Sequence, residues 1–293
     1  VLDVHGNSIV AVHDGDLVKV HIHTLYPGNI LSFAQQYGEF VKIKVENMSE
    51  QHSHLVEEDK VEKEASQTQA PKKKNALIVC CSGEGIEEMF KSQNADYIVS
   101  GGQTMNPSTE DFVKAVRAVN AENVFILPNN SNIVMAAKQA KEVVEDCNVI
   151  VIESKTIPQG MVASMMYNPE EEVEENTLEM EEALSSIKTG QVTFAIRDTS
   201  VDGVEVKKDD FIGIIDKKIV TCEPDKFKVC YYLIENMVNS ETSVITCFAG
   251  KDISDEELSN LEAVIKEKYE SQGIDIDIKR GDQPVYSFII GVE

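Results

Sequence analysis

The feature that most constrains the fold is a regular alternation of apolar and amphipathic segments from residue 76 onward. Short apolar runs such as ALIVCCS, which begins at Ala76, alternate with segments such as TEDFVKAVRAV, whose apolar residues recur at helical spacing. Uninterrupted apolar runs are typical of strands buried on both faces, and a helix between two such strands makes them parallel. The sequence therefore predicts right-handed βαβ units and a parallel sheet over residues 76–155.

Residues 156–293 predict a second lobe of a different kind. QVTFAIRDT, VEVKKDDFIGIIDKKIV, SVITCFAG and QPVYSFIIGV have the composition of strands, whereas Asp255–Ser271 has helical periodicity. Ser254 and Glu257 fit a capping box at the start of that helix. We interpret Thr156–Gly160 as a loop. The fold class is therefore α/β, with a parallel-sheet lobe followed by an α+β lobe.

For residues 1–48 we predict a small α+β piece. Residues 49–75 are rich in Glu, Lys, Gln and Ser, so we expect them to form a flexible linker to the rest of the chain. A piece of this size has too small a core to fold comfortably alone, so we expect it to belong to a larger domain. The expected elements are a hairpin of strands over Ser8–Val12 and Leu17–His23, a helix over Asn29–Tyr37 and a strand over Phe40–Val45.

Composition excludes several classes of partner. The formal net charge is -24, and such a chain repels phosphate backbones and anionic lipid, so we expect no nucleic-acid partner. No apolar run approaches the ~20 residues of a membrane span. The six cysteines form no CxxC motif and lie mostly in apolar runs, which is typical of buried thiols in a reducing compartment. We therefore expect a cytoplasmic protein.

Eight glutamates lie between Glu170 and Glu182 with no basic residue among them, in a segment of helical character. One interpretation is a solvated helix face. The other is a docking surface for a cationic partner.

Two histidines in the N-terminal piece are the strongest candidates for chemistry. His21 and His23 lie two residues apart on a predicted strand, so they share one face. Two neutral imidazoles there could hold a metal, most naturally Zn²⁺, or one could transfer protons near neutral pH. A metal needs at least a third ligand, which would come from Asp14, Asp16 or an upstream segment. The alternative interpretation is the polar face of an edge strand.

Three turns rich in Gly, Asn or Ser follow predicted strands, at the edge where open parallel sheets bind ligands. Helix N-termini at such turns could hold an anion. However, Glu84 would oppose a phosphate, the chain has no GxxxxGK[ST] loop, and tight turns explain the glycines. We therefore expect no cofactor-binding residues there. The turns are Ser82–Gly85, Ser100–Thr104 and Pro128–Ser131.

Several separated segments resemble one known family. In order, they are LVKVHIHTLYPG, YGEFVKIKVENMSEQH, VSGGQTMNPSTEDF, ILPNNSNIVMAAKQA, SKTIPQGMVA, IKTGQVTFAIRDT and the terminal GDQPVYSFIIGVE. Together they resemble the ATP-binding subunit of bacterial fatty acid kinases, in the dihydroxyacetone-kinase-like family. Asp282 departs from the pattern, because the family usually has a second glycine at this position. The departure concerns the conformation of the local turn and not the fold.

The resemblance implies that residues 1–48 are the tail of a middle domain and that residues 76–293 are a two-lobed DegV-like domain, with lobes at about 76–155 and 156–293. The family's kinase phosphorylates a fatty acid presented by a separate fatty-acid-binding DegV-type protein. The ATP and Mg sites would lie in a domain preceding this chain, so the chain alone is expected to be inactive. His21 and His23 match a histidine pair that the family needs for activity and that is associated with metal.

Two other functions stay open from the sequence. One is a stand-alone lipid-binding DegV-like module, and the other is a metal-dependent hydrolase centred on His21 and His23. A homodimer is also left open.

Overall fold

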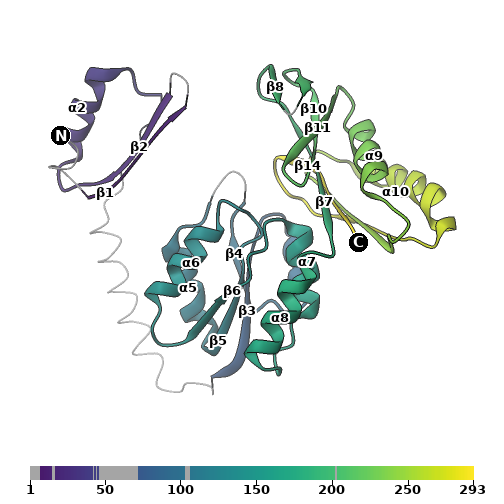
Figure 1. Ribbon diagram of the computed structural model, residues 1–293, viewed down its shortest axis with the longest axis horizontal. Coiled ribbons are helices and arrows are strands. Elements are labelled where there is room, and N and C mark those ends of the chain that lie inside the picture. Colours follow the sequence, from purple (N-terminus) through teal and green to yellow (C-terminus); the bar gives the residue numbers. More distant parts are fainter. Residues whose placement is uncertain are drawn as a thin grey trace. The chain divides into compact units, whose positions relative to one another are not determined.

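The computed structural model describes residues 7–14, 17–41, 43, 45, 72–102, 106–201 and 203–293. The chain divides into two units, Val1–Ala70 and Pro71–Glu293, and each is described by itself (Figure 1). Among the described residues, the buried hydrophobic side chains lie in the second unit, except for Ile30.

The first unit contains the predicted hairpin followed by a short helix. Pro27 begins the helix, where a missing backbone N–H costs nothing, and the rings of Phe33 and Tyr37 meet edge to face with centroids 5.3 Å apart. The prediction of a strand over Phe40–Val45 is wrong for its described residues, which belong to no strand and whose apolar side chains are exposed rather than packed on a sheet. The elements are β1 (Asn7–Asp14), β2 (Leu17–His23), α2 (Pro27–Ala34) and the 3-10 turn η1 (Gln35–Tyr37).

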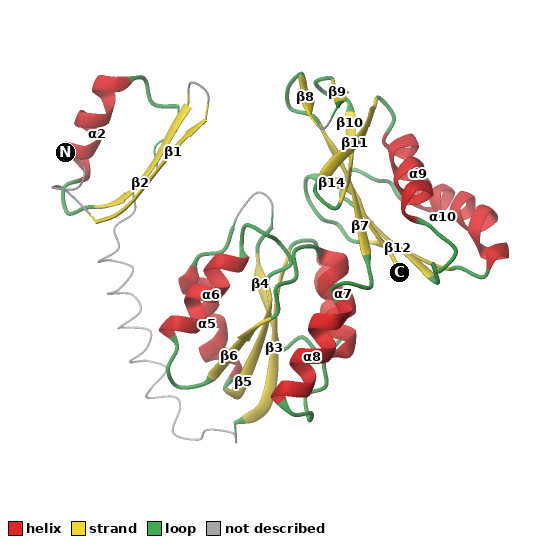
Figure 2. Ribbon diagram, in the orientation of Figure 1, coloured by secondary structure: helices red, strands yellow, loops and turns green. Residues whose placement is uncertain are grey.

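The second unit begins with the predicted parallel sheet. All its pairings are parallel, and the strand order β4-β3-β5-β6 places the two longest strands in the centre (Figure 2). Its strands are β3 (Lys73–Cys81), β4 (Tyr97–Ser100), β5 (Ala121–Leu127) and β6 (Asn148–Val151). The helices around it are α4 (Glu84–Ser92), α5 (Thr109–Val119), α6 (Val134–Val143), α7 (Ile157–Met166) and α8 (Val173–Ala183).

Strand β3 shows why this sheet is covered on both faces. Successive side chains of a strand point to opposite faces. Accordingly, Ile78 and Cys80 pack in one cluster with residues of α5 and α6, whereas Leu77 and Val79 pack in another with residues of α4, α7 and α8. The uninterrupted apolar run that predicted a buried parallel strand thus serves two separate cores. Because α7 and α8 also cover this sheet, the first lobe continues past residue 155, near which we predicted the lobe boundary.

A mixed six-stranded sheet forms the second layer of this unit, in the order β11-β10-β7-β14-β12-β13. Only its β12–β13 pairing is parallel. Helices α9 and α10 pack on one face through a cluster that includes Leu233, Leu261 and Phe288. The elements are β7 (Lys188–Phe194), β10 (Phe211–Ile215), β11 (Lys218–Glu223), α9 (Lys226–Met237), β12 (Val244–Ala249), α10 (Asp255–Tyr269), η2 (Glu270–Gln272), β13 (Asp275–Arg280) and β14 (Tyr286–Val292). A separate small ribbon pairs β8 (Thr199–Val201) with β9 (Val204–Val206).

The two sheets of the second unit share one core. Phe248 of β12 and Ile289 of β14 are buried in the same cluster as Phe90 of α4 and Phe125 of β5. Their neighbours along the strands, such as Cys247 and Ile290, point to the opposite face, toward α9 and α10. The mixed sheet therefore has apolar residues on both faces, and one face is closed by the first lobe.

Several elements differ from the sequence prediction. The segment Thr156–Gly160 is not a loop but the cap and first turn of α7, because the Thr156 hydroxyl accepts the N–H of Gln159 at 3.3 Å and Pro158 is compatible with a first turn. The long strand predicted over VEVKKDDFIGIIDKKIV is broken into β9, β10 and β11. One break is the two-residue turn Asp216–Lys217, where both residues have positive φ. Helix α9 and strand β13 were not predicted.

Two glycines let the lobes approach at the turn after β3. A Cβ on Gly83 or Gly85 would overlap backbone atoms of the segment Arg280–Gln283, and Gly83 has φ +115°. The N–H of Ile86 donates to the carbonyl oxygen of Gly281 at 3.3 Å. The glycines of Ser82–Gly85 thus serve packing between backbones, and the carbonyl of Gly281 takes a backbone N–H at the start of α4.

We predict that Gly85→Ala lowers the free energy of unfolding by about 1–3 kcal/mol, because the methyl group would displace the backbone of Arg280. Gly102→Ala is the matched control, since its Cβ would meet the Ser82 Cβ at an ordinary 3.4 Å. Urea denaturation of both variants measures the difference. Equal stability of the two would show that the lobes do not pack this closely.

Candidate functional site

The histidine pair lies in the hairpin, as the sequence predicts. His21 and His23 are residues of β2, and their backbone partners on β1 are Val10 and Asn7. The register shifts between Asn7 and Val10, so a bulge lies opposite the two histidines. Bulges bend a strand and often occur beside functional sites. The side chains of both histidines lie outside the described part, so their metal and catalytic roles stay predictions.

The donor set fits zinc in type but not in number. Imidazole is a ligand that Zn²⁺ accepts, yet a protein zinc site has three or four protein ligands. Within the part of the chain that the structure describes, no group of three His, Cys, Asp or Glu side chains is placed to hold a metal ion. The side chains of Asp14 and Asp16 lie outside the described part as well, so a third ligand from Asp14, Asp16 or an upstream segment stays a prediction.

The C-terminal edge of the parallel sheet carries a buried polar network. Ser154 Oγ accepts the N–H of Asn129 at 3.1 Å and donates to Asn129 Oδ1 at 2.7 Å. Asn129 Nδ2 donates to the carbonyl oxygen of Cys80 at 3.1 Å, which ties the ends of β3 and β5 to the loop after β6. Asn129 has φ +56°, a conformation that Asn tolerates better than most residues. Every polar atom of this pair of side chains is used internally, so the network holds the edge rigid.

The other turns at this edge also have structural roles. Ser108 caps α5, and its hydroxyl and the Asp111 carboxylate form a capping box. Of the turn Ser100–Thr104, the last two residues lie outside the described part. The nearby thiol of Cys80 is buried, and burial raises its pKa to about 12, so it is not a nucleophile at neutral pH.

The loop after β13 contains the position where the sequence departs from the family pattern. Asp282 has φ +53°, in the left-handed region that glycine or Asp can occupy, so the turn forms with aspartate. Gln283 is buried, and its Nε2 donates to the carbonyl oxygens of Phe248 at 2.8 Å and Tyr286 at 3.3 Å. Val285 has φ +73°, which is a strained backbone for a β-branched residue. Thr193 Oγ1 holds this strained residue by donating to its carbonyl oxygen at 2.8 Å.

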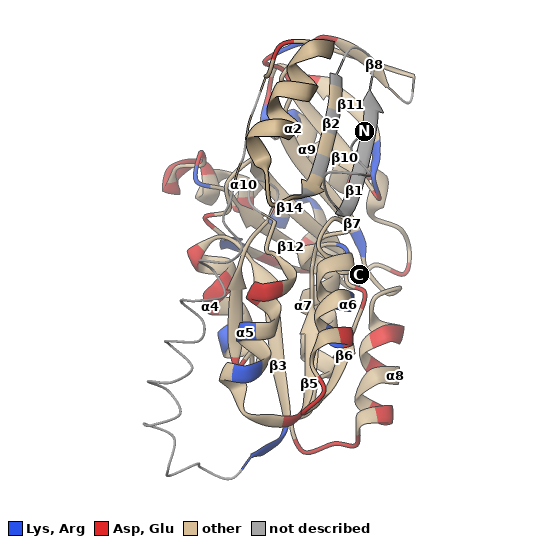
Figure 3. Ribbon diagram, turned by 90° about the vertical axis from the view of Figure 1, so that its left-hand side faces the viewer, with Lys and Arg blue, Asp and Glu red and all other residues tan. Residues whose placement is uncertain are grey.

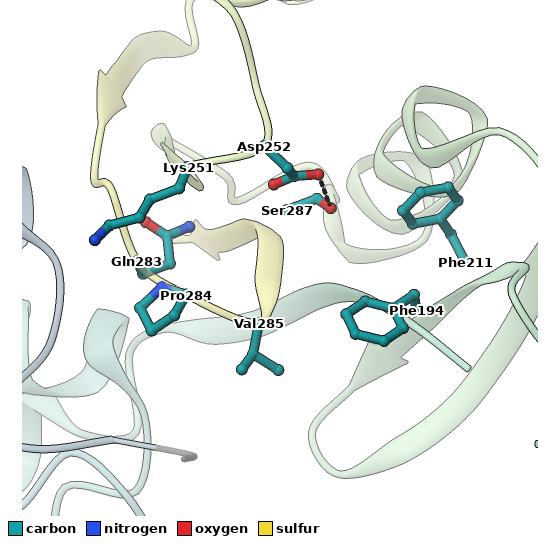
Figure 4. A pocket seen from close by; sticks show the side chains of 8 residues that line it. All are labelled: Phe194, Phe211, Lys251, Asp252, Gln283, Pro284, Val285 and Ser287. Carbon is teal, nitrogen blue, oxygen red and sulfur yellow. Dashed lines mark hydrogen bonds between the residues drawn. The ribbon is translucent and has the colours of Figure 1, made fainter. Parts of the chain in front are cut away.

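A pocket of about 260 Å³ lies beside this loop (Figure 4). Apolar side chains form most of its wall, and the Asp252 carboxylate contributes the acidic part. No sequence motif marks this pocket, because its residues come from β7, β10, β14 and two loops that only the fold brings together. The lining residues are Phe194, Phe211, Lys251, Asp252, Gln283, Pro284, Val285 and Ser287.

The predicted acidic helix is α8, and the red segments of its ribbon in Figure 3 mark acidic residues along it. Asn176 and Met180 are buried, whereas Glu174 and Glu175 are exposed. Just before the helix, Glu172 pairs with Lys74 Nζ at 2.8 Å. These contacts fit a solvated helix face, and a docking role for α8 stays a prediction.

In the described residues, no helix is both long and apolar enough to cross a membrane.

The fold defines the class of protein. The second unit is similar to solved DegV family proteins, including one from Corynebacterium glutamicum, with a TM-score of 0.55, 14% identity and coverage of 75% of this chain and 96% of that one. A DegV family protein from Thermus thermophilus, whose structure is described as showing fatty acid binding, gives a TM-score of 0.50 at 10% identity and covers 75% of this chain and 99% of its own. The class is therefore that of DegV-like α/β proteins, as the resemblance predicted.

Sequence comparison places the chain more closely. Residues 76–293 match the C-terminal domain of the FakA-like fatty acid kinase family, and residues 1–55 match the middle domain of the same family. This chain belongs to the FakA-like family. It is 45% identical over 292 residues to protein YloV of Bacillus subtilis and 42% identical over 289 residues to an uncharacterized protein of Staphylococcus saprophyticus. These matches cover 100% and 98% of this chain but 52% of either relative, so the chain spans about half their length.

We predict that Ser154→Ala lowers the free energy of unfolding by about 1–3 kcal/mol, because it leaves both the N–H and the Oδ1 of buried Asn129 without a partner. Ser131→Ala, an exposed serine in the same loop region, is the control. Thermal and urea unfolding measure both variants. A neutral effect of Ser154→Ala would mean that water replaces the hydroxyl and that the edge is not closed.

Proposed function

We propose that this chain is part of a fatty acid kinase component that acts on an acyl group carried by a separate fatty-acid-binding protein of the DegV type. The observation that carries the proposal is the match to the middle and C-terminal domains of one family, in order, over nearly the whole chain. In this function a carboxylate oxygen of the fatty acid attacks the γ-phosphorus of ATP, the bond to the ADP oxygen breaks, and an acyl phosphate and ADP are formed.

The phosphoryl donor is proposed to bind outside this chain. The described parts of the turns at the parallel edge are used for packing and capping, and near the start of α4 the N–H of Ile86 donates to the carbonyl oxygen of Gly281. Mg²⁺, when bound with ATP, would neutralise charge on the transferred phosphoryl group. Isothermal titration of this chain with Mg-ATP is therefore expected to give no binding heat, and micromolar binding would contradict this part of the proposal.

The role proposed for residues 76–293 is docking rather than storage of the acyl chain. The space between the two sheets is filled by side chains, with Phe90, Phe125 and Phe248 fully buried there. The two pockets described in this unit have about 260 and 240 Å³, below the ~300–1,000 Å³ typical of ligand sites. A DegV-like fold with a filled interior favours a platform for a partner.

The histidine pair is proposed as the part of this chain nearest the chemistry. We expect His21→Ala in the complete protein to reduce turnover by at least about a hundredfold, the scale of a lost general acid or base, while leaving the fold intact. His13→Ala, on the facing strand, is the control. Acyl phosphate formation with the acyl-binding protein and ATP gives the rate, and circular dichroism checks the fold. Near wild-type turnover for His21→Ala would remove that side chain from catalysis.

A second function, a lipid-binding module, is favoured by one observation, the DegV-like fold, since the Thermus thermophilus neighbour is described as binding fatty acid. Native mass spectrometry of the chain expressed in bacteria separates the two proposals. A co-purified fatty acid at one per chain would support the module, whereas the bare chain mass supports the docking role.

A further inference from the structure

We propose that the pocket beside the loop 281–285 is a docking site for one arginine side chain presented by a partner protein. The inference goes beyond the kinase assignment and does not depend on it, because it rests on the walls of the pocket and on the charge of the chain.

The walls of the pocket suit a long apolar stem. Phe194, Phe211 and Val285 line it (Figure 4), and Phe194 keeps 50% of its surface exposed although it is a large apolar residue. Ile196, two residues further along the chain, is 76% exposed as well. Exposed apolar surface of this kind, concentrated around a hollow, is typical of an interaction site. Aromatic rings also attract a guanidinium group through their faces.

The Asp252 carboxylate determines which chemical group can bind in the pocket. Asp252 Oδ2 accepts from Ser287 Oγ at 2.7 Å and lies 3.3 Å from Lys226 Nζ. Its other oxygen, Oδ1, has no hydrogen-bond partner among the described residues, and the Asp252 side chain remains 49% exposed. An apolar guest would strip water from this oxygen without replacing the hydrogen bond, and an anionic guest would be repelled. A guanidinium group supplies both the donor and the positive charge.

The other charged side chains near the pocket do not argue against a guanidinium guest. Lys226 is already bound, since it pairs with Asp252 and Glu257 and donates to the Asp252 carbonyl oxygen at 2.9 Å. Figure 4 shows the Lys251 ammonium turned away from Phe194 and Phe211. The net charge of -24 attracts basic surfaces to the whole chain. The occupant we commit to is therefore an arginine at the tip of a partner surface.

The strained backbone of the loop 281–285 also suits an arginine-binding pocket. Val285 keeps φ +73° because the Thr193 hydroxyl holds its carbonyl oxygen and Gln283 is anchored to Phe248. Strain of this kind persists only where the surrounding structure fixes it. Here it sets the Val285 side chain in the pocket wall before any partner arrives, so little ordering is needed on binding.

The test is a titration of the whole 293-residue chain, labelled with ¹⁵N, by three small probes followed by TROSY NMR. The probes are N-acetyl-arginine amide, its neutral isostere N-acetyl-citrulline amide and the apolar N-acetyl-norleucine amide. We expect saturable shifts of the Phe194, Val285 and Ser287 amides with the arginine probe and at least about fivefold weaker binding of the other two, the scale of one charge-assisted contact.

Two variants locate the binding. Asp252→Asn should weaken binding of the arginine probe by about fivefold. Phe194→Ala removes a half-exposed side chain and leaves the fold intact, and it should weaken binding by about two- to fivefold. Asp277→Asn, at a partly exposed aspartate of β13 outside the pocket lining, is the matched control and should change nothing. Absence of shifts with arginine overturns the proposal, and so does equal binding of norleucine, which would indicate an apolar anchor site. The probes contain neither ATP nor the acyl-binding protein, so the result is independent of the kinase proposal.

Discussion

The second unit depends on one packing contact, the burial of Phe248 and Ile289 of the mixed sheet in the core that covers one face of the parallel sheet. Neither sheet can close its apolar faces without the other. Removing a buried phenylalanine from a shared core of this kind typically costs about 3–5 kcal/mol, a large part of the stability of a whole domain. The contact therefore makes the two lobes one folding unit, although the first is parallel α/β and the second a mixed sheet with two helices.

The same contact sets the geometry of everything at the junction of the lobes. It brings the segment Arg280–Gln283 against Gly83 and Gly85, and this fixes the loop that carries Asp282 and Val285. The buried network of Asn129, Ser154 and the Cys80 carbonyl stiffens the neighbouring edge of the parallel sheet. This region of the chain is thus occupied by protein backbone and side chains, as the proposed docking role requires. The pocket lined by Phe194 and Asp252 lies beside that loop as well.

Much of the fold could be predicted from the sequence, and the failures have physical reasons. The buried strand β3 and the helix α5 were recognised because apolar runs and helical periodicity are local signals. Helix α9 was missed because KFKVCYYLIENM contains many residues typical of strands, and only Asp225, which caps it by accepting the N–H of Phe227 at 2.8 Å, marked its start. The proline of α7 suggested a loop although it suits a first helical turn.

The candidate sites were less predictable, because their residues meet only in the folded chain. The histidine pair could be named from its spacing in one strand, and its family could be recognised from motifs. The pocket could not, since Phe194, Asp252 and Val285 come from separate segments whose contact is set by the mixed sheet. The sequence explained the glycines of Ser82–Gly85 by a tight turn, but it could not show that a backbone segment far along the chain, Arg280–Gln283, packs against them.

The lengths of the strands in the parallel sheet have a consequence for how the protein behaves when it is concentrated. Its edges are formed by β4 and β6, which have four residues each, whereas the central β3 has nine. A short edge exposes few unpaired backbone N–H and C=O groups, and these groups are what a foreign strand needs for edge-to-edge pairing. The sheet thus combines a long, stable centre with edges too brief to serve as templates, which protects it from aggregation by strand addition.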